Sequence, residues 1–211
     1  MKLYILIITT SSLFTAFSQS AGYKEGMKKN IQAFESANFI KAASGFETLA
    51  IAEKKEWLPF YYAGLCDVLN AFQKPKTEID TWCDKAEGFA RRADSLSKNN
   101  SEILVLKSMI AAARIKVNEL KRGQKYGMQA TKFANEAVKL NDANPRAHFV
   151  KAQATLYTPA AFGGGEKKAK PIFELAIEKS KTFKTESSLH PGWGKAEAEQ
   201  ELKKINNKTK K

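Results

Sequence analysis

Small apolar residues recur along this chain at spacings of four and three positions. The first set is Ala42, Phe46 and Leu49. The same spacing returns in three later sets, which are Ala86, Ala90 and Ala93, then Ala130, Ala134 and Ala137, then Ala169, Phe173 and Ala176. Residues four and three apart share one face of an α-helix, and small side chains there let a neighbouring helix approach closely. Successive sets begin 44, 44 and 39 residues apart (86 − 42, 130 − 86 and 169 − 130), and this nearly constant period predicts a helical repeat array.

Helix-breaking segments separate these sets. Polar residues, Pro and Gly gather at 73–76, 98–102, 141–145, 158–165 and 190–194. The helices predicted between them cover 23–36, 39–55, 57–73, 77–97, 100–121, 123–141, 145–157, 166–182 and 195–206. No alternation of apolar and polar residues bounded by hairpin-turn residues favours strands. The pattern therefore predicts an all-α fold of about four antiparallel helix hairpins plus a C-terminal helix.

The N-terminal segment has the pattern of a secretory signal peptide. Its mostly apolar run, Leu3–Phe14, follows a positive start and is too short to span a bilayer. Small residues two positions apart then predict that the mature chain begins at Gln19, with Ala21 as a second choice. An uncleaved N-terminal anchor is the alternative. We expect residues 1–20 to be a signal peptide and the protein to be exported, either to the periplasm or by secretion, with no transmembrane span in its mature form.

The chain is strongly basic, with 35 Lys and Arg against 22 Asp and Glu and a formal net charge of +13. Its hydrophobic content of 43% is that of a globular protein, and we expect one helical repeat domain over 21–206. Residues 207–211 carry lysines without any acid and are expected to form a basic disordered tail. Such a protein is drawn to anionic surface polymers or lipid head groups, whereas export argues against nucleic acid as the partner.

The sequence contains no recognisable catalytic or metal-binding set. Two Cys and two His are too few for a four-ligand zinc site. His148 and His190 have no Ser or Cys nucleophile beside them in a catalytic motif, so both are interpreted as structural. Gly163–Lys168 resembles a phosphate-binding loop, but it lacks the Gly-Lys-Ser/Thr ending and is interpreted as a turn between helices. We therefore expect no enzyme activity, no metal and no cofactor.

Cys66 and Cys83 lie on either side of the predicted turn at 73–76. Their midpoint falls inside that turn, so in an antiparallel hairpin they stand at matching heights on facing helices. An oxidising compartment would permit a disulfide between them, worth ~3 kcal/mol in the loop-entropy model. The other interpretation is that each Cys is a small buried apolar residue. The sequence leaves both interpretations open.

The repeat resembles the tetratricopeptide-repeat (TPR) family. Ala42-x3-Phe46 and Ala169-x3-Phe173 match the Ala-x3-Phe of its second helices, and Phe60-x2-Ala63-Gly64 matches part of its first helix. Leu140–Pro145 is similar to the turn between repeats. Asp67 stands where the family has Tyr, and the period exceeds the family's usual length, which predicts longer helices in each pair.

Two further segments resemble exported bacterial TPR-like proteins. Tyr157–Gly165 reads YTPAAFGGG, and Leu189–Gly194 reads LHPGWG, within a resemblance that covers residues 23–204. The resemblance implies a non-enzymatic interaction or scaffold protein in the cell envelope that binds a peptide, a protein or another ligand in a groove. The alternative is a transport accessory that cradles a small ligand for delivery to a membrane or solute-binding partner.

By analogy with TPR grooves, residues from the first helix of a pair are candidates to line the groove. They are Tyr61, Tyr62, Arg146, His148 and Gln153. For each of them, packing in the core is the competing interpretation. A closed apolar cavity would favour the transport accessory, and an open groove of mixed polarity would favour the interaction protein.

Overall fold

The computed structural model describes residues 21–208, which form nine α-helices and one short 3-10 turn, η1 (Ala160–Phe162). The helices are α1 (Ala21–Glu35), α2 (Phe39–Ala52), α3 (Trp57–Gln73), α4 (Ile79–Leu96), α5 (Ser101–Ile115), α6 (Glu119–Leu140), α7 (Pro145–Tyr157), α8 (Glu166–Thr182) and α9 (Lys195–Lys208). The predicted signal peptide and residues 209–211 of the predicted basic tail lie outside the described residues, whereas residues 207 and 208 are helical and belong to α9. Within residues 21–208 no helix is long and apolar enough to cross a membrane.

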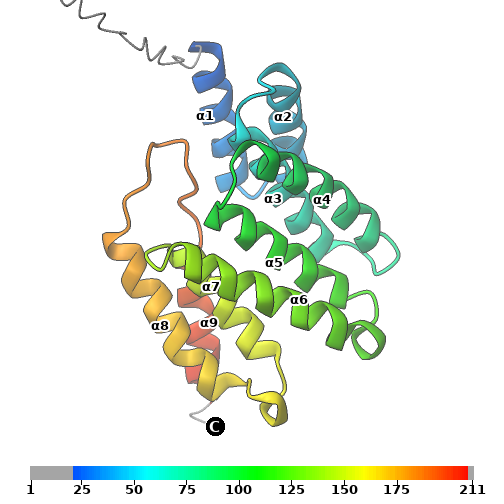
Figure 1. Cartoon of the computed structure of the whole chain (residues 1–211), viewed down its shortest axis with the longest axis vertical. Coiled ribbons are helices and arrows are strands. Elements are labelled where there is room, and N and C mark those ends of the chain that lie inside the picture. Colours follow the sequence, from blue (N-terminus) through cyan, green and yellow to red (C-terminus); the bar gives the residue numbers. More distant parts are fainter. Residues whose placement is uncertain (1–20, 209–211) are drawn as a thin grey trace, which may run out of the picture.

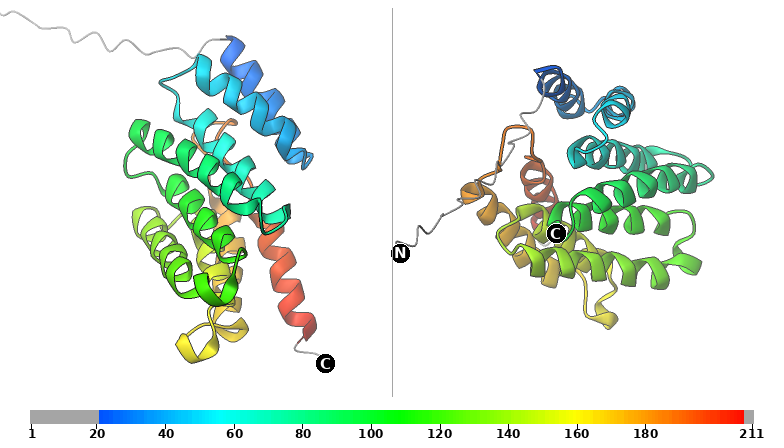
Figure 2. Two further views of the ribbon diagram at one scale, coloured as in Figure 1. Left: turned by 90° about the vertical axis from the view of Figure 1, so that its right-hand side faces the viewer. Right: turned by 45° about the horizontal axis from the view of Figure 1, so that its top comes forward.

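The helices stack as successive hairpins. Each of the pairs α1/α2, α3/α4, α5/α6 and α7/α8 packs along its length, and each pair packs on the next, as Figures 1 and 2 show. The first helices of neighbouring hairpins also touch, because α5 contacts both α3 and α7. Helix α9 closes the stack against α8 and α7. The predicted all-α, TPR-like array of four hairpins and a terminal helix is confirmed for the described residues.

The stripes of small residues lie at the contacts between helices. Ala42, Phe46, Ala86, Ala90, Ala93, Ala130, Ala134, Ala137, Ala169, Phe173 and Ala176 are all buried. Leu49 is partly exposed and packs at the edge of the core. Because alanine side chains are short, α6 comes close enough to α5 for two serines of α5 to reach its backbone. Ser101 Oγ donates to the carbonyl oxygen of Ala137 at 3.0 Å, and Ser108 Oγ donates to that of Ala130 at 2.9 Å.

Asparagine side chains mark the start of four helices. The Oδ1 atoms of Asn38, Asn100, Asn118 and Asn144 accept backbone N–H groups in the first turns of α2, α5, α6 and α7. The cap at Asn118 corrects one predicted boundary. The sequence pattern placed the break between the third pair of helices at residue 122, whereas α5 ends at Ile115 and α6 begins at Glu119. Asn118 accepts the N–H of Lys121 at 3.0 Å, and this local hydrogen bond fixes the earlier start.

Cys66 and Cys83 are buried free thiols, and no disulfide joins them in the structure. The Cys83 side chain faces the next hairpin, where its Sγ lies 4.0 Å from the carbonyl oxygen of Ile110 in α5. Burial raises the pKa of both thiols well above the ordinary value, so both stay protonated and pack as small apolar groups.

One buried carboxyl group lacks hydrogen bonds. Asp67 of α3 is fully buried, and neither of its oxygens has a hydrogen-bond partner in the described part of the chain. The ammonium group of Lys85 lies 3.7 Å from Oδ1 and also pairs with Glu47. Burial raises the pKa of Asp67 to about 7, although the charge of Lys85 acts in the opposite direction. The carboxyl group therefore titrates near neutral pH.

Ala134→Glu tests the seam between α5 and α6. The substitution places a carboxylate where the wild-type side chain is fully buried, and an unpaired buried charge costs several kcal/mol. We expect the melting temperature to fall by more than about 10 °C. Asn135→Glu, one position along the same helix on the exposed face, is the control and should change it by no more than about 2 °C. Equal melting temperatures for the two variants would contradict the seam.

Asp67→Asn tests the buried carboxyl group. The raised pKa means that the folded state keeps its proton longer than the unfolded state, so the native carboxyl loses stability as the pH rises from about 4 to about 7. Asparagine does not titrate and escapes that loss, which is about 1.4 kcal/mol for each pKa unit at most. Relative to the parent, the variant should gain several degrees in melting temperature between pH 5 and pH 8. If the difference in melting temperature between variant and parent is the same at pH 5 and at pH 8, Asp67 is ionised over that whole range.

Candidate functional site

A buried ion pair joins the first turns of α5 and α7. The guanidinium group of Arg146 donates from Nη2 to Glu102 Oε1 at 2.7 Å and from Nε to Oε2 at 2.8 Å. The two side chains are only 3% and 11% exposed. Nearby charges raise the pKa of Arg146 against the effect of burial, so the guanidinium stays charged. Because the two helices belong to neighbouring hairpins, this pair fixes their relative height in the stack.

Asn144 ties the ion pair to the backbone. It caps α7 by accepting the N–H of Arg146 at 3.0 Å. Its amide nitrogen donates to Glu102 Oε1 at 2.8 Å and to Ser101 Oγ at 3.0 Å. Ser101 in turn donates to the α6 backbone, so three helices share one buried hydrogen-bonded network. Arg146, Glu102 and Asn144 therefore have little freedom to move.

The segment between α8 and α9 joins this network through Trp193. The Trp193 indole donates from Nε1 to the Tyr61 hydroxyl at 3.0 Å, across 132 positions of sequence, and that hydroxyl lies 3.5 Å from Glu102 Oε2. Burial raises the pKa of Tyr61 well above the ordinary value, so the hydroxyl keeps its proton. The chain then passes Arg146 at Gly194, where φ is +107° and a Cβ would stand 3.1 Å from Arg146 Cγ. A larger residue would not fit at Gly194 without strain.

A cavity of about 400 Å³ lies beside the network. Its walls come from the turns before α5 and α7, the start of α3 and the 183–191 segment, which Figure 1 shows arching away from the end of α8. Three rings line it, those of Trp57, Phe183 and His190, and the Arg146 guanidinium lies 5.0 Å over Phe183. The remaining charged lining residues are Lys98, Glu102, Lys184 and Glu186.

His190 contributes both a ring and polar nitrogen atoms to the lining. Its ring lies 5.8 Å from that of Trp57 in an edge-to-face arrangement. Nδ1 shares a hydrogen bond with Ser187 Oγ at 2.9 Å, and Nε2 lies 3.3 Å from the exposed Glu186 carboxylate. No cluster of three metal-ligating side chains occurs among residues 21–208. Aromatic faces beside cationic groups suit the cavity to a flat ligand that carries negative charge.

The five residues predicted to line a groove lie in different environments. Arg146 lines the cavity. Tyr61 does not line it, but its hydroxyl contacts Glu102, which does. Tyr62 is buried, with its ring stacked 4.8 Å from that of Phe46. His148 is buried too and donates from Nε2 to the carbonyl oxygen of Asp142 at 2.8 Å. Gln153 is partly exposed on α7 and does not line the cavity.

Sequence reasoning missed Glu102, Asn144, Trp57 and Phe183. The sequence pattern predicts turns at the segments that contain Glu102 and Asn144. The two residues are 42 positions apart, and no local pattern marks them as partners. The one available signal was the Leu189–Gly194 motif. It contains Trp193, which anchors the segment that covers the cavity.

No family model and no curated protein matches the chain. It is similar to the solved structure of the HusA haemophore from Porphyromonas gingivalis. The two share 35% sequence identity with a TM-score of 0.82, over 91% of this chain and 96% of that one. It is also similar to a thermophilic TPR protein from Thermus thermophilus, at 13% identity with a TM-score of 0.66, over 89% of this chain and 82% of that one. The second likeness shows the fold alone.

Breaking the ion pair from either side tests its role. Arg146→Met leaves the Glu102 carboxylate buried without its cation, and Glu102→Leu leaves the guanidinium without its anion. Each single variant should lose about 3–5 kcal/mol of unfolding free energy. The double variant should be more stable than either single one, because no unpaired charge remains. Urea unfolding measures all three, and losses below about 1 kcal/mol in both single variants would show that solvent reaches the pair.

Proposed function

We propose that this protein, which belongs to the same family as the HusA haemophore, is an exported non-enzymatic protein that binds haem or a closely related porphyrin. Of the two classes that the sequence left open, that relative supports the small-ligand carrier, whereas the mixed polarity of the cavity is the feature expected of an interaction protein. Delivery to a membrane or solute-binding partner is part of the proposal. Residues 1–20 serve in it as the export signal.

The cavity beside Arg146 is the single observation that supports this function in the chain itself. Haem is a flat aromatic ring system with two carboxylate groups on one edge. Trp57, Phe183 and His190 offer ring faces, and Lys98 and Lys184 offer cations for the carboxylates. A volume of about 400 Å³ lies toward the lower end of the range for small-ligand sites, so part of the ring would extend into solvent.

The buried network gives the cavity a fixed wall. Arg146 makes bidentate contacts to Glu102 and stacks over Phe183, so binding requires little rearrangement of that wall. The 183–191 segment is anchored by Trp193 at one end and by α8 at the other. The wall that this segment forms is therefore held at both ends.

Hemin titration with a charge-reversed cavity tests this function. Lys98→Glu with Lys184→Glu changes two exposed side chains of the lining, which should leave folding intact. Repulsion of the carboxylates should weaken hemin binding by about tenfold or more, as measured by the change in hemin absorbance and by quenching of tryptophan fluorescence. Lys121→Glu with Lys132→Glu on α6 makes the same change in net charge away from the cavity and is the control.

Two results would count against the proposal. The absence of saturable hemin binding by the parent protein would refute the function. Equal weakening in both double variants would show that overall charge, rather than this cavity, governs binding.

A further inference from the structure

Two aromatic rings stand in solvent at the far end of α7. Tyr157, the last residue of α7, is 75% exposed, and Phe162 of η1 is 81% exposed. Both belong to the YTPAAFGGG motif, and neither lines the cavity. Single exposed apolar residues, such as Leu120 on α6, are common on protein surfaces. Two large rings on one short connection need a reason other than folding.

The backbone that follows Tyr157, the connection of residues 158–165, is held in one conformation. Gly163 and Gly165 have φ values of +88° and +93°, which favour glycine. A Cβ on Gly164 would overlap the carbonyl oxygens of Thr158 and Thr155. Gly165 N–H donates to the Thr155 carbonyl oxygen at 2.9 Å, and Gly164 N–H donates to that of Pro159 at 3.2 Å. The connection therefore has a specific backbone conformation, and Phe162 is exposed in it.

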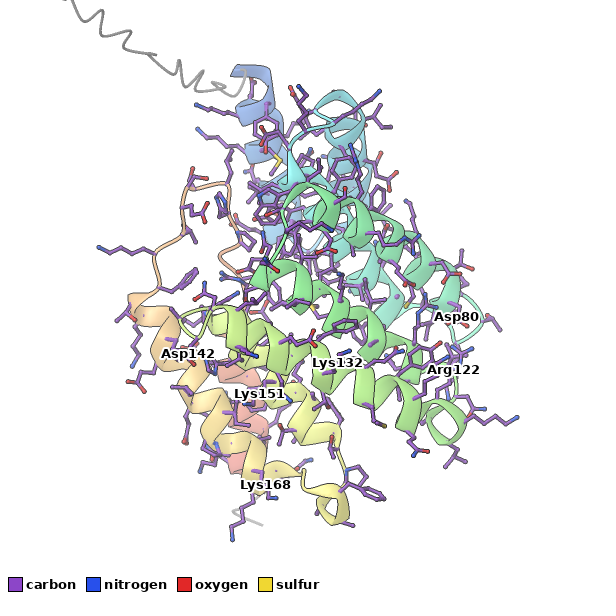
Figure 3. All side chains as sticks on the ribbon, in the orientation of Figure 1. Asp80, Arg122, Lys132, Asp142, Lys151 and Lys168 are labelled. Atoms are coloured by element: carbon purple, nitrogen blue, oxygen red, sulfur yellow. The ribbon has the colours of Figure 1, made fainter. Side chains whose placement is uncertain are left out.

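Lysines lie at the same end of the molecule as the two rings. The Lys168 ammonium lies 3.7 Å from the point where a Cβ of Gly163 would stand, and Figure 3 labels it at this end of the stack. Lys167 and Lys168 are exposed and have no ion pair among residues 21–208. Lys204 and Lys208 lie in the last turns of α9 and are 56% and 71% exposed.

The balance of charge here is positive. Lys204 pairs with Glu201, and Lys208 pairs with Glu166, each at 2.7 Å. Lys167 and Lys168, at the start of α8, have no paired anion among residues 21–208. Figure 1 and the left view of Figure 2 show the connection and the end of α9 at the same end of the molecule, with a gap between them in the latter view.

We propose that this end of the molecule docks on an anionic lipid surface. Tyr157 and Phe162 enter the headgroup layer, where aromatic side chains are favoured, and the lysines contact headgroup phosphates. A protein partner fits less well, because a stable interface buries about 800 Å² on each side around an apolar centre. Here two separated rings stand among cations, which suits shallow insertion.

The geometry leaves the cavity free during docking. Arg146 lies in the first turn of α7, and Tyr157 ends the same helix of 13 residues. Tyr157 is 11 positions beyond Arg146, so at a rise of about 1.5 Å per residue the two sites lie about 17 Å apart along the helix axis. The inference goes beyond the proposed function and does not depend on what the cavity binds.

Vesicle co-sedimentation tests the docking. The full mature chain should bind vesicles of phosphatidylcholine with phosphatidylglycerol more tightly than vesicles of phosphatidylcholine alone, and added salt should weaken the binding. Tyr157→Ser with Phe162→Ser should reduce the vesicle partition coefficient at least about tenfold. Lys167→Gln with Lys168→Gln should reduce it by about fivefold for each charge. Leu120→Ser, which removes an exposed apolar side chain elsewhere, should have no effect.

A positional probe and hemin titration complete the test. In Phe162→Trp, anionic vesicles should shift the added tryptophan emission to shorter wavelength, and the parent should show no such shift. The Tyr157/Phe162 double variant should retain the parent's melting temperature and hemin affinity. Vesicle binding unchanged in that variant would overturn the proposal, as would a loss of hemin binding with vesicle binding intact. If the parent binds vesicles but not hemin, the docking stands and the proposed haem function fails.

Discussion

The ion pair between Glu102 and Arg146 is the contact on which the rest of the site depends. It lies where the first turns of α5 and α7 meet, and both side chains are almost removed from solvent. A buried ion pair adds little net stability compared with an apolar contact, because both charges lose their hydration. Its effect is to specify one arrangement, since any other height of α7 against α5 would leave two buried charges apart. Asn144, Ser101 and Tyr61 satisfy the remaining hydrogen bonds of that arrangement.

Close packing of the hairpins brings those two turns together. The alanine stripes bury side chains too short to keep the backbones apart, and serines of α5 then bond directly to carbonyl groups of α6. Asparagine caps start α5 and α7 two positions before Glu102 and Arg146, so helix initiation also sets the position of the charged groups. The network thus follows from the same features that define the repeat.

The segment between α8 and α9 completes the cavity. Residues 183–191 do not form a helix. They contribute one wall of the cavity beside the network, and Trp193 then bonds the chain to Tyr61. Trp57, Phe183 and His190 consequently meet from two distant parts of the sequence around one cavity. The two proposed contact regions lie at opposite ends of α7, so ligand binding and surface docking do not compete for the same residues.

The sequence by itself determined the class of fold and the pairing of its helices. Helix periodicity and helix-breaking residues are local signals, and the recurrence of Ala86 and Ala130 at one offset indicates the repeat without any knowledge of contacts. Local signals were weakest where a single side chain decides a boundary, as Asn118 does before α6. Tertiary structure alone decided that Tyr62 and His148 belong to the core while Arg146 faces a cavity. Burial and charge pairing depend on groups that fold together from distant positions, and no spacing along the chain records which groups will meet.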